Sequence, residues 1–189
     1  MDYFLFSLMG FILGGTMFSY HLPLIFKKVN IVTDSPDHNP GTANAMKYGG
    51  VAVGFLCLLC DVAKGFLPVF LARKELDINN IFFSFVMLAP VLGHAFAPLY
   101  KFKGGKAIAT TFGVLLALLP QVKISIILIV LYIAFSTILK VNPHERRTVV
   151  TFALFALLST VYCVYYGNLS LILGVLTISA VVAYKNYIG

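Results

Sequence analysis

Residues 93–111 read GHAFAPLYKFKGGKAIATT, and this stretch decides what fold and chemistry are expected of the 189-residue chain. After an initial Gly-His, three lysines alternate with aromatic residues and a Gly-Gly pair, and a small-residue helix start follows. The backbone N–H groups of a Gly-Gly turn that leads into a helix suit a phosphate, and lysine adds a formal positive charge. Because two apolar runs of membrane length flank the stretch, it predicts phosphate binding at a membrane surface and indicates lipid chemistry.

Composition places the chain in a membrane. Hydrophobic residues make up 60% of it and charged residues 11%, whereas an ordinary soluble domain carries about 25% charged residues. No stretch between the apolar runs is long enough for a second domain, so residues 1–189 are expected to form one all-α, polytopic transmembrane domain. The net charge of +7 comes from basic residues that lie between apolar runs, which favours a lipid bilayer and not nucleic acid as the partner.

Two further patterns limit the interpretation. The first apolar run, residues 3–26, has no basic segment before it and no small-residue cleavage site after it, so it is predicted to be a retained span and not a signal peptide. Cys57, Cys60 and Cys163 have apolar neighbours in the sequence, which favours buried thiols over a redox or metal pair. Neither a metal ion nor a cofactor is therefore expected.

About seven apolar segments approach the length that crosses ~30 Å of hydrocarbon. A single helix over residues 148–184 would be roughly 55 Å long, so the chain is predicted to fold back at Gly167-Asn168. The apolar run from Ala107 to Leu139 is interrupted by Pro120, Gln121 and Lys123. Its two halves are short, so a tilted or half-inserted arrangement stays open for them. The predicted spans are about 3–26, 49–72, 79–100, 106–122, 124–140, 149–166 and 169–186.

The lysines and arginines predict the orientation of these spans. With the N-terminus outside and the C-terminus in the cytoplasm, ten basic residues face the cytoplasm and three face outward. Because cytoplasmic loops are enriched in positive charge, this orientation is preferred, and it places the loops at about 27–48, 101–106 and 140–148 on one side. The ten residues are Lys27, Lys28, Lys47, Lys101, Lys103, Lys106, Lys140, Arg146, Arg147 and Lys185, and the three are Arg73, Lys74 and Lys123.

Two ionisable residues lie within the second predicted span. Asp61 and Lys64 are three residues apart, so they share one helix face and can neutralise each other. Ionisable groups at this depth indicate either a functional site or a structural ion pair, and both interpretations stay open. If the helix lies closer to the cytoplasm, Lys64 becomes a second phosphate ligand. Small residues predict close helix packing at Gly10, Gly14, Gly50 and Gly54.

The first predicted loop carries polar residues in the pattern N-x-G-x-x-N-x-x-K over residues 39–47. Together with the turn-forming residues just before it, the pattern favours a folded loop that presents polar groups. A merely solvated loop is the alternative, and this segment alone does not decide between them.

Taken together, these segments resemble the bacterial acyl-phosphate:glycerol-3-phosphate acyltransferase family (PlsY type). The family's first motif, S-G-N-x-G-x-x-N-x-x-R, is degraded here. This chain keeps Asn39, Gly41 and Asn44 but has Asp37, His38 and Lys47 in place of the serine, glycine and arginine. The family's D-x-x-K-G is matched by Asp61, Lys64 and Gly65.

The family's second loop motif is matched more fully. Its outline G-H-x-x-P-x-x-x-x-F-K-G-G-K-x-x-A-T corresponds to Gly93, His94, Phe102, Lys103, Gly104, Gly105, Lys106, Ala109 and Thr110, with Pro98 one place late. The likeness covers about residues 10–120. The family carries a third motif, with a histidine and an asparagine, after its last span, and that motif is absent from this chain.

The resemblance implies transfer of an acyl chain from an acyl phosphate to the 1-hydroxyl of glycerol 3-phosphate in the bacterial cytoplasmic membrane, giving lysophosphatidic acid. The two substrates are the implied partners besides the bilayer. Asp37 is a candidate base, although its carboxylate would repel a phosphate. His94 is the other candidate base, and a structural histidine at a helix end is the preferred alternative. The implied substrate-binding residues are Asn39, Gly41, Asn44, Lys47, Lys64, Lys103, Gly104, Gly105, Lys106 and Thr110.

Other functions stay open on sequence grounds. The departures from the motifs allow a relative that uses another acceptor, an inactive relative, or a transporter for a phosphorylated or lipid solute that uses Asp61 and Lys64. Residues 144–147, His-Glu-Arg-Arg, lack the second histidine of H-E-x-x-H, so a zinc protease is unsupported. The two arginines there, Arg146 and Arg147, are interpreted chiefly as residues that set the membrane orientation, and contact with a phosphate is the alternative.

Overall fold

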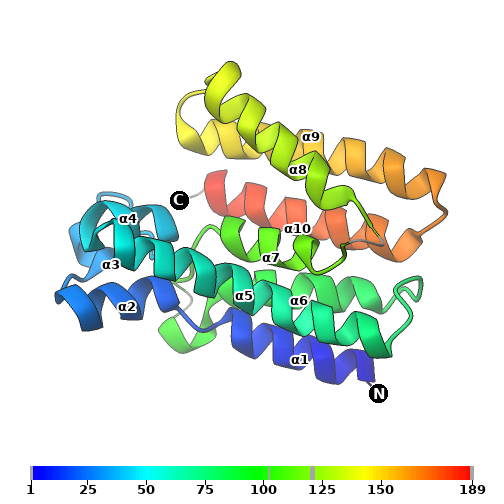
Figure 1. The fold of residues 1–189 in the computed structure, drawn as a ribbon, viewed down its shortest axis with the longest axis horizontal. Helices are drawn as coiled ribbons and strands as arrows, with labels where there is room; N and C mark the ends of the chain where they lie inside the picture. The colour runs from blue at the N-terminus through cyan, green and yellow to red at the C-terminus, as the bar shows by residue number, and fades with distance from the viewer. Residues whose placement is uncertain (1, 102, 120–121, 188–189) are drawn as a thin grey trace.

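The structure, a computed structural model, describes residues 2–101, 103–119 and 122–187 and is all-helical over those ranges, as the sequence predicts (Figure 1). Phe102 of the second loop motif, and Pro120 and Gln121, which were expected to interrupt an apolar run, lie outside the described residues. The elements are α1 (Asp2–Gly14), α2 (Phe18–Lys27), α3 (Ile31–Asp34), α4 (Thr42–Gly49), α5 (Val51–Glu75), α6 (Phe83–Phe96), the 3-10 turn η1 (Pro98–Tyr100), α7 (Ile108–Leu116), α8 (Ile124–Ile133), the π-helical turn η2 (Ala134–Ile138), α9 (His144–Tyr165) and α10 (Leu169–Tyr187).

Five segments of the described chain are long and apolar enough to cross a membrane. A sixth, Ile124–Ile138, is apolar but shorter, and α7 has only nine residues. The two short segments are the two halves that the sequence leaves between a tilted and a half-inserted arrangement. The protein is a multi-pass membrane protein, and its exact number of spans and its orientation remain predictions. The five long segments are Asp2–Lys27, Val51–Glu75, Phe83–Tyr100, His144–Tyr165 and Leu169–Tyr187.

The first span is not one continuous helix. The span predicted at about 3–26 corresponds to the candidate span Asp2–Lys27, and it contains a break between α1 and α2. The break leaves the carbonyl of Thr16 outside the helical hydrogen-bond ladder, and the Lys64 ammonium, which lies on α5, donates to this oxygen at 2.6 Å. In a membrane every freed backbone group needs such a partner. The sequence around the break does not reveal it, because the partner comes from a distant segment.

Two of the predicted packing glycines bring pairs of helices close together. A Cβ atom at Gly14 would lie 2.1 Å from the Pro90 carbonyl oxygen, so α1 and α6 pack almost backbone to backbone. A Cβ atom at Gly54 on α5 would lie 2.2 Å from Cγ of Met46 on α4. The prediction of packing at Gly50 was wrong, because nothing lies within 4 Å of a Cβ there and its φ of +91° instead makes the turn between α4 and α5.

The predicted reversal near residue 167 is confirmed. Helix α9 ends at Tyr165 and α10 begins at Leu169. Gly167 has a φ of +67°, a conformation that glycine adopts without a steric penalty. The Asn168 side chain then accepts a hydrogen bond from the Leu171 N–H at 2.9 Å and caps the first turn of α10.

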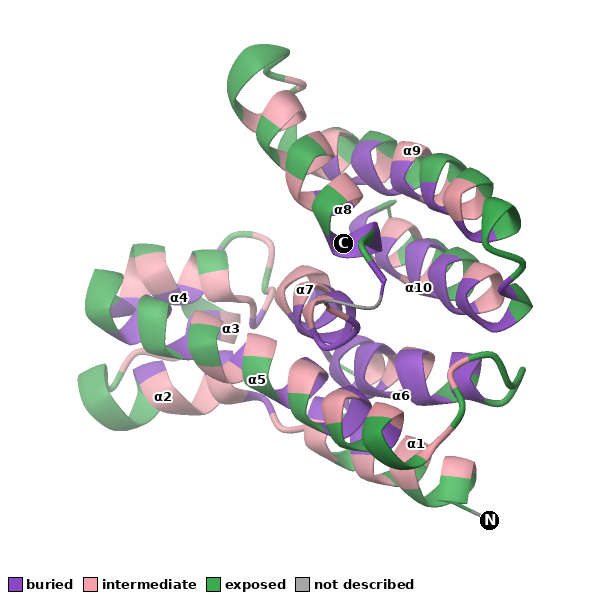
Figure 2. Cartoon of the chain, turned by 45° about the vertical axis from the view of Figure 1, so that its right-hand side comes forward, coloured by how far each residue is buried: buried purple, intermediate pink, exposed green. Residues whose placement is uncertain are grey.

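Burial is greatest at the centre of the bundle, and apolar side chains are exposed around it. Figure 2 shows buried residues concentrated on α6 and α7, whereas the outer sides of α1, α5 and α9 are exposed. Large apolar side chains on those outer sides include Phe4, Phe55 and Leu157. An apolar outer surface of this kind suits contact with lipid tails.

The predicted basic loops gather at one end of the molecule. Figure 1 places α3, α4 and the beginnings of α7 and α9 at the end where the C-terminus lies, and places the N-terminus at the opposite end. We call this end, which holds residues 28–50, 97–107 and 139–143, the basic end. Its loops lie next to one another, and the candidate site is found among them.

Candidate functional site

A cavity of about 300 Å³ opens at the basic end, and we call it the Lys106 cavity. Four separate parts of the chain contribute polar side chains to it: the loop before α4, the middle of α5, the end of α6 with the loop that follows, and the beginning of α9. Its polar side chains come from Asn39, Thr42, Asp61, His94, Lys106, His144 and Arg147.

Lys106 is the central cation of this cavity and is only 6% exposed. Its ammonium nitrogen lies 3.4 Å from Asp37 Oδ2 and 3.6 Å from Glu145 Oε1. It also lies 3.4 Å from His144 Nε2. A lysine at this depth keeps its charge at a low free-energy cost when carboxylates are close. Lys106 therefore joins the second loop to both the first loop and the beginning of α9.

Asp37 is held in place by the loop that precedes α4. The Asn44 side-chain amide donates to Asp37 Oδ1 at 2.7 Å and to the Asn39 carbonyl at 2.9 Å. Partial burial raises the pKa of Asp37, but the Asn44 hydrogen bond and the charge of Lys106 outweigh it, so the net pKa lies below the ordinary 3.8. Asp37 is therefore ionised at neutral pH. The loop is folded, as the N-x-G-x-x-N-x-x-K pattern favours.

A buried polar cluster on α5 forms the floor of the cavity. Asp61 Oδ2 accepts hydrogen bonds from the Ser19 hydroxyl at 2.6 Å and the Thr42 hydroxyl at 3.2 Å. Asp61 Oδ1 lies 2.9 Å from the Lys64 ammonium and 3.9 Å from His94 Nδ1. Asp61 thus connects α2, α4, α5 and α6 beside the cavity. Lys64 is directed toward Asp61 and Thr16, and it does not line the cavity.

Gly104 and Gly105 are buried against the end of α6. A Cβ atom at Gly104 would lie 2.1 Å from the His94 carbonyl oxygen, and one at Gly105 would lie 2.4 Å from His94 Nε2. The Gly105 N–H donates to the His94 carbonyl at 3.1 Å. The two glycines therefore serve the close approach of this loop to α6, and their prediction as phosphate ligands stays a prediction.

The beginning of α9 forms a wall that the motifs do not mark. His144 and Arg147 both line the cavity, and Arg147 Nε is buried without a hydrogen-bond partner among the described residues. The sequence contains a usable signal, since a histidine and an arginine three residues apart at the start of a helix share one face. The position of Arg147 at the cavity favours the alternative interpretation of this arginine, contact with a phosphate, which stays a prediction.

Apolar side chains form the rest of the cavity wall. Leu58 comes from α5, Ile108 and Phe112 come from α7, and Tyr132 comes from α8. The Phe112 and Tyr132 rings meet edge to face with centroids 5.7 Å apart. The cavity thus combines a charged end with an apolar side, which matches a ligand that has one charged and one apolar part.

The structure separates the predicted site residues into two groups. Asn39, Gly41, His94 and Lys106 line the cavity, Asp37 contacts Lys106, and Asn44 holds the Asp37 loop. The others lie elsewhere: Lys47 is exposed with its ammonium over the Tyr48 ring, Lys103 lines a different cavity, and Thr110 is buried outside the Lys106 cavity lining. Sequence proximity thus overstates how many of these residues line one cavity.

The described residues include no group of three or more His, Cys, Asp or Glu side chains arranged to hold a metal ion. Cys57, Cys60 and Cys163 are free thiols, and Cys57 and Cys163 are buried. The chemistry available in the cavity therefore comes from lysine, arginine, histidine, carboxylate and amide groups.

Comparison with known sequences identifies related proteins. The family profile described as glycerol-3-phosphate acyltransferase matches residues 4–188. Glycerol-3-phosphate acyltransferase 2 of Thermotoga maritima is 40% identical over 118 residues, which cover 62% of this chain and 59% of that protein. The chain thus spans less than two thirds of this relative. Glycerol-3-phosphate acyltransferase of Pseudothermotoga lettingae is 35% identical over 176 residues, which cover 85% of this chain and 84% of that protein.

Two crystal structures share the fold. Both are of PlsY (YgiH), an integral membrane glycerol 3-phosphate acyltransferase, in its glycerol 3-phosphate form and its lysophosphatidic acid form. The first has a TM-score of 0.84 and 22% identity, and the match covers 99% of this chain and 89% of that one. The second has a TM-score of 0.79 and 23% identity over 98% of this chain and 88% of that one. At this identity the likeness establishes the all-helical membrane fold.

Proposed function

Because this chain belongs to the glycerol-3-phosphate acyltransferase family, we propose that it transfers an acyl chain to the 1-hydroxyl of glycerol 3-phosphate, giving lysophosphatidic acid for phospholipid synthesis. The proposed donor is an acyl phosphate, and the proposed location is the bacterial cytoplasmic membrane. The known relatives carry the same acyltransferase name, and the two PlsY crystal forms hold the acceptor and the product.

The observation that carries this proposal is the meeting of two motif loops at one cavity. Asn39 and Gly41 from the first loop line the same cavity as Lys106 from the second. Both substrates are anions, and Lys106 and Arg147 supply two cations within the cavity. The apolar wall made by Leu58 and Phe112 suits the beginning of an acyl chain. The cavity therefore suits both the anionic groups of the two substrates and the acyl chain that is transferred.

The reaction needs positioning more than strong chemistry. In an acyl phosphate the carbonyl carbon is already activated, and phosphate is a good leaving group. The glycerol 1-hydroxyl oxygen forms a bond to that carbon, the bond from the carbon to the phosphate oxygen breaks, and the hydroxyl proton goes to the departing phosphate. Lys106 and Arg147 hold the two anions together and stabilise the negative charge that develops on the carbonyl oxygen. No protein nucleophile is required.

We assign Asp37 a positioning role. Its pKa below 3.8 makes it a weak proton acceptor at neutral pH. Its 3.4 Å ion pair with Lys106 fixes the lysine at the cavity wall. The earlier prediction of Asp37 as a base stays a prediction, as does that of His94, whose buried ring lines the cavity. Asn39 and Thr42 are the proposed hydrogen-bonding partners of the glycerol hydroxyl groups.

A second candidate is an acyltransferase of the same class with a different acceptor. Asp37 and Glu145 both lie within 3.6 Å of Lys106 and offset its charge. A neutral or cationic alcohol would meet less repulsion there than a phosphate dianion. Replacing glycerol 3-phosphate with glycerol or an amino alcohol in the assay distinguishes this candidate.

The decisive experiment incubates the detergent-purified protein with palmitoyl phosphate and labelled glycerol 3-phosphate and measures lysophosphatidic acid. The wild-type protein should form product, and Lys106→Ala should lower the rate by about 100-fold or more, because it removes a buried cation from the transition state. Lys123→Ala, which changes an exposed lysine at the opposite end, is the matched control and should retain activity. Product formation by Lys106→Ala at the control rate would reject the assignment.

The same preparation tests the non-enzymatic alternative. A transporter for a phosphorylated solute would take up glycerol 3-phosphate into proteoliposomes without forming lysophosphatidic acid. Uptake without product, together with an inactive wild-type protein in the acyl-transfer assay, would overturn the proposed activity.

A further inference from the structure

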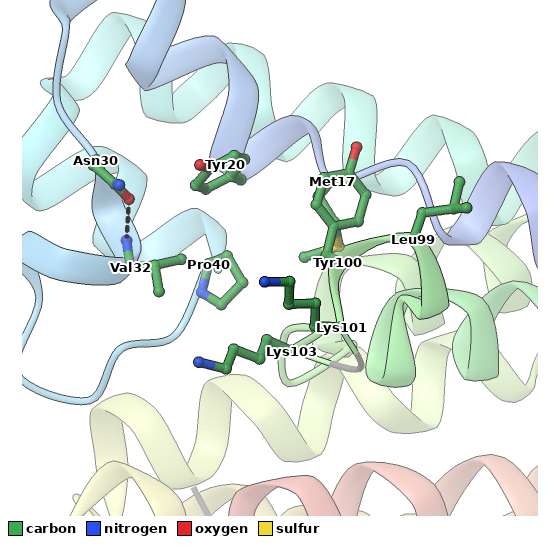
Figure 3. A pocket seen from close by; sticks show the side chains of 9 residues that line it. All are labelled: Met17, Tyr20, Asn30, Val32, Pro40, Leu99, Tyr100, Lys101 and Lys103. Atoms are coloured by element: carbon green, nitrogen blue, oxygen red, sulfur yellow. Dashed lines mark hydrogen bonds between the residues drawn. The ribbon is translucent and has the colours of Figure 1, made fainter.

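A second cavity of about 300 Å³ lies at the basic end, beside η1. It is lined by residues from the α1–α2 connection, the segment that begins α3, and the loop around η1. Figure 3 shows its lining side chains: Met17, Tyr20, Asn30, Val32, Pro40, Leu99, Tyr100, Lys101 and Lys103. The residues assigned to acyl transfer do not include any of these.

The second cavity is distinct from the Lys106 cavity. Among the described residues the two share no lining residue. They are adjacent, however, because Pro40 lines the second cavity and its chain neighbours Asn39 and Gly41 line the first. One short segment of the loop before α4 therefore separates two cavities that lie on either side of it.

The second cavity carries two cations without counter-charges. Lys101 and Lys103 are exposed, and within the described parts of the chain neither ammonium has an ion pair or a hydrogen bond. Figure 3 shows both side chains extending toward the opening near Pro40. Two unpaired lysines that converge on one opening favour a ligand with a phosphate or another strongly anionic group.

The position of the cavity places it at the level of lipid headgroups. The candidate spans Asp2–Lys27 and Phe83–Tyr100 both supply residues to it, and the second of them ends there. Tyr20 and Tyr100 line it, and tyrosine is enriched where membrane spans meet the aqueous phase. Tyr100 makes a hydrogen bond with His21, which holds its ring in the wall.

The remaining wall of the cavity includes apolar side chains, one of them exposed. Leu99 is 87% exposed at its edge, and Met17 is buried at its base. An exposed leucine beside two lysines fits a ligand whose charged group continues into an apolar part. A free phosphate would leave this apolar half without contact.

We propose that the second cavity binds the phosphate headgroup of an anionic membrane lipid. Lys101 and Lys103 pair with the phosphate, and Leu99 and the tyrosine rings contact the glycerol and the first acyl carbons. A soluble phosphate ester offers the same charge, but the headgroup-level position and the apolar edge favour the lipid. The bound lipid touches Pro40 and so lies directly against the loop that holds Asn39 and Gly41.

The test uses the full chain in nanodiscs of phosphatidylcholine that contain a photoreactive phosphatidic acid. After irradiation, mass spectrometry should find cross-links in residues 17–32 and 98–103. Lys101→Gln combined with Lys103→Gln should lower this labelling by about tenfold or more, because it removes both charge-assisted contacts to the lipid phosphate. The absence of cross-links in these segments of the wild-type protein would overturn the proposal.

A matched control separates a site from a generally basic surface. Lys27→Gln combined with Lys28→Gln removes the same charge from exposed positions, and each pair contains one lysine with a positive φ, 58° for Lys28 and 56° for Lys101. This control should lower the labelling by less than about threefold, because its charges lie outside the cavity. Equal losses in both double variants would overturn the proposal.

Two further arms test the apolar half and the source of the phosphate. Leu99→Glu puts a negative charge at the exposed edge and should lower the labelling as strongly as loss of the lysines; unchanged labelling would contradict the site. Inorganic phosphate at millimolar concentration should leave the labelling intact, and full competition by it would show that the cavity serves a soluble anion. Thermal unfolding of each variant verifies that it is folded.

Discussion

Lys103 and Lys106 lie three residues apart in one loop, yet their surroundings differ in every respect. Lys106 is buried, lies within 3.6 Å of two carboxylates and faces a cavity with polar groups from four parts of the chain. Lys103 is exposed, has no counter-charge in the described structure and lines the second cavity, at whose edge Leu99 is exposed. The buried lysine is fixed in one position, whereas the exposed one is free to adapt.

On the two proposals above, this difference allows the same residue type to serve two tasks. A paired and buried cation is held in one geometry, which is the property that transition-state stabilisation requires. An unpaired cation at a membrane surface attracts anions over a range of positions, which suits a mobile lipid headgroup. The Gly104-Gly105 pair produces the contrast, because it brings the chain against α6 between the two lysines.

The largest effect is expected from replacing Asp61, the buried carboxylate that lines the Lys106 cavity. Asp61→Asn should lower the free energy of unfolding by about 3–5 kcal/mol, because it leaves the buried Lys64 ammonium without its counter-charge. Chemical unfolding in mixed detergent micelles measures this change. Glu75→Gln, which alters an exposed carboxylate on the same helix, is the control and should change stability little. Equal stability of the two variants would show that Asp61 is dispensable.

A smaller effect, on catalytic efficiency, is expected from replacing Arg147, which α9 contributes to the wall of the Lys106 cavity. Arg147→Ala should lower kcat/KM for glycerol 3-phosphate by ~10- to 100-fold, as expected for a lost hydrogen bond between charged groups. Arg146→Ala removes the same charge from the adjacent, exposed residue and should remain within about twofold of wild type. If both variants lose the same activity, Arg147 acts only through the general positive potential of the basic end.

The smallest effect is expected from replacing Asp37, whose carboxylate offsets the positive charge of Lys106. Asp37→Ser should raise kcat/KM for glycerol 3-phosphate by about twofold to fivefold, because it removes a partly exposed negative charge near the acceptor phosphate while Glu145 and His144 still contact Lys106. The ratio of variant to wild type should be constant from pH 5 to 8, since the pKa of Asp37 lies below 3.8 and the carboxylate stays ionised there. Loss of activity in Asp37→Ser would instead identify Asp37 as the base.

The lowered pKa of Asp37 also predicts how the stability of the folded protein changes with acid pH. A depressed carboxyl pKa means that the Lys106–Asp37 pair contributes stability above pH 3.8, and this contribution is lost as the pH falls through the lower pKa of the folded state. Unfolding of the wild-type protein should therefore become easier below about pH 4, and Asp37→Ser should lack this part of the response. A titration of thermal unfolding against pH compares the two.

Much of the fold follows from local patterns in the sequence. Apolar runs and the turn at Gly167-Asn168 predict where the helices begin and end, because each depends on residues close in the chain. The break before α2 does not follow from them, because it depends on Lys64 from α5 binding the free carbonyl of Thr16. The role of Gly50 was also missed, because a glycine that makes a turn and a glycine that allows close helix packing cannot be told apart in the sequence.

The site is less predictable than the fold for a similar reason. The motif loops identify Asn39, Gly41 and Lys106, which share one cavity. They do not identify His144 and Arg147, which reach that cavity only because α9 begins at the same end of the molecule. Nor do they separate Lys103 from Lys106, since that depends on how closely the glycine turn approaches α6.

The distribution of the cavity wall along the chain has a consequence for biogenesis. The last contributors, His144 and Arg147, come after about three quarters of the 189 residues have been synthesised. A nascent chain in the translocon that ends before α9 holds both motif loops but has an incomplete anion pocket. On the proposed function, a chain that ends before α9 should therefore be unable to turn over substrate, and activity should first appear once α9 has been added.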